Sequence, residues 1–123
     1  MENKTNYSIA RLGILSDIEP KVFLKDQLDL TGCEVSFGTI PAGQEVPFLH
    51  AHKENEEVYI FLQGNGTFHI DGEELHVEEG CIIKVTRAGV RGLKSGNKNL
   101  IYICIQAKEG SLNQATADDG IIS

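Results

Sequence analysis

The sequence lacks several features that would assign it to a specialised class of protein. No apolar run approaches the ~20 residues of a membrane-spanning helix, and the start, MENKTNYSIARLG, has no continuous apolar core of a secretion signal. We therefore expect a cytoplasmic protein without a membrane partner. The 11 lysines and arginines are scattered and outnumbered by 18 acidic residues, for a net charge of −7. This charge would repel a phosphate backbone, so we expect no nucleic-acid partner.

Cysteine is also scarce. The three cysteines, Cys33, Cys81 and Cys104, are widely spaced and form no Cys-x-x-Cys pair. An odd number without such a pair argues against a disulfide framework and against a zinc site built from thiolates. Each cysteine has apolar, strand-like neighbours, so we expect small buried side chains. A reactive thiol stays open as the alternative, chiefly at Cys104 if its side chain faces a pocket.

The chain is long enough, at 123 residues, for one domain with a hydrophobic core. Helical periodicity is hard to find, whereas apolar residues alternate with a period of two and turn signals recur about every ten residues. This pattern predicts an all-β sandwich or barrel. We expect an N-terminal strand or extension over residues 1–31, a barrel over 32–107 and a C-terminal extension over 108–123. The predicted strands are residues 32–40, 57–63, 67–70, 73–77, 81–86 and 99–107, with a further strand and turn over 21–28.

Two turn signals and one unusual pattern refine this prediction. The Asn-Gly step at residues 64–66 predicts a hairpin that pairs 57–63 with 67–70, and Asp71-Gly72 predicts another. Several strands are apolar on both faces, as in VYIFL and LIYICI. A sheet face that water covers is normally polar. The outer face should therefore be covered by the N-terminal segment or by a second subunit, and we expect a homodimer.

One segment, HAHKENEEVYIFLQGNG, carries the candidate chemistry. His50 and His52 point to the same face if the segment is a strand. The four polar residues that follow favour a reversal that would bring Glu57, at the start of the next strand, alongside them. Two imidazoles and one carboxylate form a site for a divalent cation that leaves coordination positions open. Zinc, iron, manganese and nickel all suit these ligands. The alternative is that the histidines are exposed or satisfied within the core.

This segment resembles the first motif of the cupin family, in the small single-domain form with a conserved β-barrel. The motif runs from a glycine, here Gly43, through His-x-His at His50 and His52, to Glu57 and a closing Gly64. The gap after the first glycine is one residue longer than usual. The resemblance covers residues 32–107 and implies a double-stranded β-helix, or jelly roll, with the metal at the mouth of the barrel.

The second motif of the family is incomplete in this chain. After Gly80, Thr86 stands where the family has proline, Ala88 where it has glycine, and Arg91 where it has the histidine that is the fourth metal ligand. A shift of one residue would put Gly92 there instead. If Arg91 points inward, its positive charge disfavours a cation unless an anion lies between them, which predicts a ligand with a carboxylate. If it points outward, the site is degenerate.

The resemblance implies oxygenation, isomerisation or decarboxylation of a small acidic or polar molecule, or simple binding of one, and no residue is assigned as catalytic. A non-catalytic protein with a degenerate or empty metal site is the alternative. Four strand residues could line the cavity with Arg91 and contact this ligand: Tyr59, Phe61, Tyr102 and Gln106. His69 and His76 are expected to be exposed. His69 is the better substitute metal ligand, because its predicted hairpin partner carries Glu57.

Overall fold

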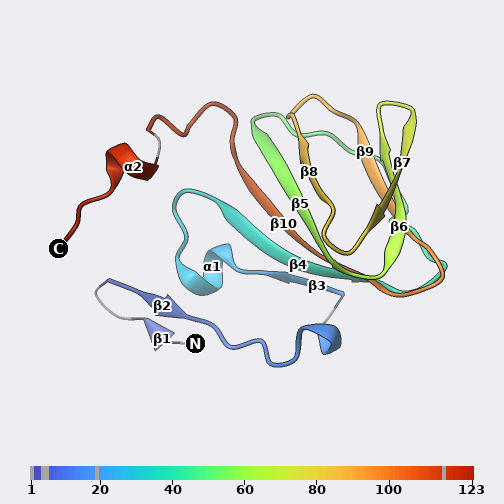
Figure 1. Ribbon diagram of the computed structural model, residues 1–123, viewed down its shortest axis with the longest axis horizontal. Coiled ribbons are helices and arrows are strands. Elements are labelled where there is room, and N and C mark those ends of the chain that lie inside the picture. Colours follow the sequence, from blue (N-terminus) through green and yellow to red (C-terminus); the bar gives the residue numbers. More distant parts are fainter. Residues whose placement is uncertain (1, 4–5, 19, 115) are drawn as a thin grey trace.

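The protein is described by a computed structural model that covers residues 2–3, 6–18, 20–114 and 116–123, and its fold is nearly all β (Figure 1). The strands are β1 (Glu2–Asn3), β2 (Ser8–Ile9), β3 (Lys21–Phe23), β4 (Glu34–Ile40), β5 (Asn55–Gln63), β6 (Asn65–Ile70), β7 (Glu73–Glu78), β8 (Ile82–Val85), β9 (Arg91–Ser95) and β10 (Leu100–Lys108). The helical segments are short: a 3₁₀ turn at Leu15–Asp17, α1 (Lys25–Leu28) and α2 (Thr116–Asp119).

Two antiparallel sheets form the barrel. The larger has five strands in the order β3-β4-β10-β5-β8, and the smaller has three in the order β7-β6-β9. This is the predicted double-stranded β-helix. Figure 1 shows the small β1–β2 pair and α2 lying on the side away from the three-stranded sheet. No helix in the described part of the chain is long and apolar enough to span a membrane.

The strands form where the sequence alternates between a buried and a less buried position. In β5, the buried residues are Glu57, Tyr59 and Phe61, while the residues between them are only half-buried. Aromatic rings from both sheets fill the interior: the Tyr59 ring lies 5.0 Å from that of Phe68 in β6 and 6.0 Å from that of Tyr102 in β10. These three rings line the same cavity as His50.

One predicted hairpin is confirmed and the other is wrong. Asp71 and Gly72 both have positive φ, and they join β6 to β7 in register. In contrast, β6 pairs with β7 and β9 rather than with β5. Gly64, with φ of 89°, turns the chain from the large sheet into the small one. A Cβ at this position would lie 2.0 Å from the carbonyl oxygen of Asn99, so only glycine fits this crossing without a shift of backbone.

Strand β9 is absent from the sequence prediction. Its sequence, RGLKS, has no strand-like run of apolar residues, yet it is the edge of the small sheet. The segment before β5 runs along that edge: the amide of Val46 donates to the carbonyl of Leu93 at 2.9 Å. His50 forms an isolated bridge with Arg91 further along.

The outer face of the large sheet is apolar, as expected. Its side chains are half-buried along the middle strands, and the side chain of Ile82 on β8 is 64% exposed. The members of this outer apolar face are Val35, Phe37, Val58, Ile60, Leu62, Ile82, Ile103 and Ile105.

Candidate metal and ligand site

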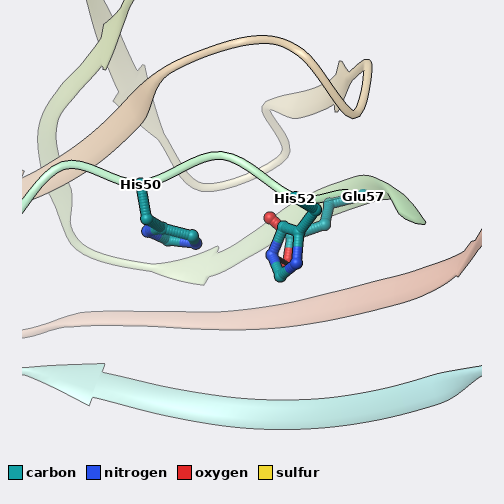
Figure 2. A group of neighbouring side chains, drawn as sticks. All are labelled: His50, His52 and Glu57. Carbon is teal, nitrogen blue, oxygen red and sulfur yellow. Dashed lines mark ion pairs between the residues drawn. The ribbon is translucent and has the colours of Figure 1, made fainter. Parts of the chain in front are cut away.

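His50 and His52 are held beside the small sheet by backbone hydrogen bonds. The amide of His50 donates to the carbonyl of Arg91 at 3.0 Å, and the amide of Arg91 donates back to the carbonyl of His50 at 2.9 Å. The amide of His52 donates to the carbonyl of Arg87 at 2.9 Å. The two imidazoles project from the same side of their segment (Figure 2), with ring centroids 5.2 Å apart.

Glu57 reaches the histidines from the opposite sheet. It lies in β5, paired with Gln106 of β10 and Val85 of β8, whereas His50 is bonded to the edge of the small sheet. The expectation that these two strands run alongside each other is therefore wrong. The ligand atoms meet because the two sheets face each other across the interior.

Three ligand atoms converge at this point. One atom each from His50, His52 and Glu57 lies within 4.8 Å of the others. His52 Nε2 is 3.1 Å from Glu57 Oε2, yet this nitrogen has no hydrogen bond in the described structure. His50 Nδ1 is likewise buried without a hydrogen bond. Ligand bonds of about 2.0–2.2 Å place neighbouring ligand atoms about 3 Å apart, so these residues fit a divalent ion.

Arg91 points into the barrel and engages the carboxylate directly. Its Nη1 donates to Glu57 Oε1 at 3.1 Å, and its Nη2 donates to the carbonyl of Thr86 at 2.7 Å. The Tyr59 hydroxyl also donates to Glu57 Oε1, at 2.7 Å. Both donors thus hold one oxygen of the carboxylate, and the other oxygen, Oε2, faces His52. The Nε of Arg91 is buried and has no partner among the described residues.

The site opens into a cavity of about 460 Å³. Three formally charged side chains occur among the described residues of its lining: Glu57 and Arg91 are buried, while Lys21 of β3 is exposed. With neutral histidines these charges sum to +1, from two cations and one carboxylate. The whole chain carries −7. A positive cavity in an acidic protein favours an anionic ligand.

Comparisons with known proteins identify the family and agree with the fold. The Cupin domain family matches residues 36–105. This chain belongs to the cupin family. Among solved structures, a cupin protein from Bacteroides fragilis is 38% identical, with a TM-score of 0.83 over 100% of this chain and 99% of that one. No curated protein matches the sequence significantly.

Two more distant structures share the cupin fold. A structure from Thermotoga maritima, described as a predicted oxalate decarboxylase, is 23% identical, with a TM-score of 0.55 over 62% of this chain and 64% of that one. The cupin domain of Cnp3 from Schizosaccharomyces pombe is 19% identical, with a TM-score of 0.59 over 63% of this chain and 57% of that one. At these identities the likeness concerns the fold alone.

The structure places most, but not all, of the other expected site residues in this cavity. Tyr59, Tyr102 and Gln106 line it together with Arg91. Phe61 does not line it; its side chain is 1% exposed and packs within the core. The sequence analysis missed Lys21. A strand and turn were predicted over 21–28, and residues two apart in a strand share a face, so Lys21 and Phe23 could have been placed together.

His69 and His76 do not belong to the His50, His52 and Glu57 cluster of this cupin. His69 is on β6, whose partners are β7 and β9, so the premise that its hairpin partner carries Glu57 is wrong. Its Nδ1 is 3.6 Å from Glu74, and its side chain is 29% exposed. The side chain of His76 is 67% exposed, beside Glu78.

Burial controls the protonation of the groups around the site. Burial lowers the pKa of His50, an effect that Glu57 opposes and Arg91 reinforces, which favours the neutral, metal-binding imidazole. Burial, followed by the nearby Cys104 and Glu57, raises the pKa of Tyr59, so its hydroxyl keeps its proton. Burial also raises the pKa of Cys104 to about 12, reinforced by Glu57. Cys104 lines the cavity, but at neutral pH it is a thiol rather than a nucleophilic thiolate.

Proposed function

We propose that this cupin binds a divalent metal ion through His50, His52 and Glu57, and that the metal and Arg91 together bind a small molecule bearing a carboxylate. The observation that carries the proposal is the approach of His52 Nε2 to Glu57 Oε2 at 3.1 Å without a hydrogen bond. Two electron-pair donors at this distance require a cation or a shared proton between them. Zinc, iron, manganese and nickel each accept imidazole and carboxylate ligands.

Charge supports the carboxylate part of the proposal. Arg91 neutralises Glu57 within the site, since both side chains are buried and bonded to each other. A divalent ion held by neutral histidines would then leave a net charge of about +2 in a low-dielectric cavity. An anionic ligand offsets this charge. The unpaired Nε of Arg91 is a buried donor for the same ligand.

The chemistry available to this arrangement is Lewis-acid activation of the ligand, which a bound metal would supply from its open positions. Oxygenation, isomerisation and decarboxylation of a small acid all fit that description. The residues of the chain would bind and orient the acid. Arg91 would bind its carboxylate, and the aromatic side chains that line the cavity would contact the rest of the molecule.

A second candidate function is carboxylate binding without metal or catalysis. The observation that favours it is the ion pair itself, because Arg91 and Tyr59 already satisfy one oxygen of Glu57 without a metal. In that case Arg91 Nε and the two histidines would act only as hydrogen-bonding groups.

Equilibrium dialysis against Mn²⁺, Fe²⁺, Ni²⁺ and Zn²⁺, followed by elemental analysis, tests the metal site. We expect one ion per chain in the wild type and at least tenfold weaker binding in His50→Ala and His52→Ala. His69→Ala is the matched control, because the side chains of His69 and His52 are 29% and 27% exposed. Failure to take up any of the four ions would refute metal binding. Calorimetry with butyrate, with and without metal, then separates the two candidates.

We also propose that this cupin forms a homodimer through the outer apolar face of its large sheet. Half-buried isoleucine, valine and leucine side chains on β4, β5 and β10, together with the exposed Ile82 on β8, favour a partner surface over water. Analytical ultracentrifugation at micromolar concentration should show a dimer, and Ile103→Lys, on the central strand β10, should shift it toward monomer. A monomeric wild type would refute the dimer.

A further inference from the structure

Among the described residues that line the cavity, Lys21 is the cation outside the candidate metal site. It lies on β3, the edge strand of the large sheet, and its side chain is exposed. Its ammonium sits 5.1 Å from the centroid of the Tyr102 ring and 5.5 Å from that of Phe23. Contacts of this kind with two ring faces restrict a flexible lysine. Because Lys21 and Phe23 are exposed whereas Glu57 and Arg91 are buried, Lys21 marks the mouth of the cavity.

The sheet register explains how Tyr102 comes to lie beneath Lys21. Gly38 of β4 is paired with Lys21 on one side and with Tyr102 on the other. A Cβ on Gly38 would lie 2.6 Å from Cζ of Tyr102, so the ring occupies the space that a side chain at position 38 would fill. The ring therefore crosses β4 and reaches β3. Burial raises the pKa of Tyr102 to about 12, so its hydroxyl is a hydrogen-bond donor at neutral pH.

Lys21 has no carboxylate partner within ion-pair distance in the described part of the chain, although the protein carries 18 acidic residues. An ordered cation that lines a cavity without a counter-ion is suited to the charge of a ligand. The rest of the lining is mainly apolar and aromatic, and includes Phe68 and Leu93. The cavity thus combines two cations, Arg91 and Lys21, with a largely apolar wall.

We propose that Lys21 and the Tyr102 hydroxyl form a second anion subsite at the cavity mouth, and that the ligand of this cupin is a short dicarboxylate. One carboxylate lies at the metal and Arg91, and the other at Lys21. The position of the first carboxylate rests on the proposed function, whereas the position of the second rests on Lys21 and Tyr102. It makes Lys21 the residue that distinguishes a dicarboxylate from a monocarboxylate.

The test is isothermal titration of the Mn²⁺-loaded protein with malonate, succinate and glutarate, and with butyrate as the monocarboxylate. We expect at least one dicarboxylate to bind more tightly than butyrate, and its length to reflect the separation of the two subsites. Lys21→Met keeps the apolar stem over the rings and removes the charge. It should weaken the best dicarboxylate by about fivefold, as expected for a partly exposed ion pair, weaken butyrate less, and not lower Mn²⁺ affinity.

Lys84→Met is the matched control, because Lys84 is an exposed lysine of β8 and does not line the cavity. It removes the same charge from the chain and should change no affinity. Equal weakening of dicarboxylate and butyrate by Lys21→Met would overturn the subsite, as would wild-type protein that prefers no dicarboxylate. If Mn²⁺ and butyrate bind normally in either case, the proposed function stands and only the subsite fails. Loss of Mn²⁺ binding in the wild type would instead refute the metal site.

Discussion

Arg91 and Glu57 form an ion pair in the interior of the barrel. Arg91 Nη1 lies 3.1 Å from Glu57 Oε1, and the two side chains are 1% and 4% exposed. Arg91 also holds His50 through two backbone hydrogen bonds. A single residue of the small sheet is thereby bonded both to a histidine beside it and to a carboxylate of the large sheet.

The burial of this pair predicts a large cost when one partner is removed. Arg91→Met leaves the Glu57 carboxylate buried without its counter-charge, which should lower the free energy of unfolding by about 3–5 kcal/mol. Glu57→Gln should cost a similar amount. The double variant should cost at least 2 kcal/mol less than the sum of the two, since neither charge is left alone. Urea unfolding of the metal-free proteins measures all four values.

Arg87 and Glu109 provide the comparison. Their Nε to Oε2 distance is also 3.1 Å, but the side chains are 57% and 33% exposed. Arg87→Met and Glu109→Gln should show a coupling below about 1 kcal/mol, because water and side-chain entropy weaken an exposed pair. Equal coupling in the two pairs would contradict the assignment of the Arg91–Glu57 energy to burial.

Metal binding should stabilise the folded chain, because the two histidines and Glu57 come from two segments, one beside the small sheet and one in the large sheet, whose side chains meet only in the folded protein. At an ion concentration of 100 times Kd, linkage adds about 2.7 kcal/mol. For a domain of this size that corresponds to a rise in Tm of roughly 10 °C. Differential scanning calorimetry with Mn²⁺ or Ni²⁺ measures the rise, and EDTA should reverse it. At the same ion concentration, His52→Ala should reduce the rise by about half or more, and His69→Ala should retain it.

The strands and the clustering of two histidines with a glutamate could be predicted because both depend on local spacing. Alternation located β5 and β10 to within two residues, and the spacing of His50, His52 and Glu57 indicated that their side chains converge. The pairing of β6 could not be predicted from the Asn-Gly step alone. That step resembles a hairpin turn, but the backbone of Asn99 packs against Gly64 from a distant part of the chain. A contact of this kind is set by tertiary structure.

The state of Arg91 was also beyond the sequence. An arginine in a strand can extend toward solvent or point inward. Its orientation depends on whether the interior contains a carboxylate with which it can pair. Glu57 provides that carboxylate from the other sheet, together with the carbonyl of Thr86. Of the two alternatives, the inward arginine is the one found. Its guanidinium also bonds directly to Glu57, the carboxylate of the candidate metal site, which was not foreseen.

Cys104 should be the least reactive cysteine of the folded protein. A pKa of about 12 leaves roughly one thiol in 10⁴ ionised at pH 8, and the side chain is 4% exposed. Iodoacetamide at pH 8, followed by peptide mass spectrometry, should modify Cys33 and Cys81, which are half-buried, before Cys104. Reactivity of Cys104 should rise as the pH approaches 12. In urea all three should react alike; rapid labelling of Cys104 in the folded state would contradict its burial.

The crossing at Gly64 should tolerate no side chain. Gly64 and Gly72 have φ values of 89° and 85°, so alanine pays a similar conformational cost at both positions. They differ in space: a Cβ at Gly72 meets nothing within 4 Å, whereas one at Gly64 lies 2.0 Å from the Asn99 carbonyl oxygen. Gly64→Ala should therefore be less stable than Gly72→Ala by about 3 kcal/mol in urea unfolding.

The comparison isolates the crossing because the strain in φ cancels between the two variants. Gly64→Ala must displace the backbone at Asn99, which lies just before β10. Tyr102 and Cys104 of β10 line the cavity. The metal affinity of Gly64→Ala should fall along with its stability, while Gly72→Ala should bind metal as the wild type does. Equal stability of the two alanine variants would mean that the chain does not pass between the sheets at Gly64 as described.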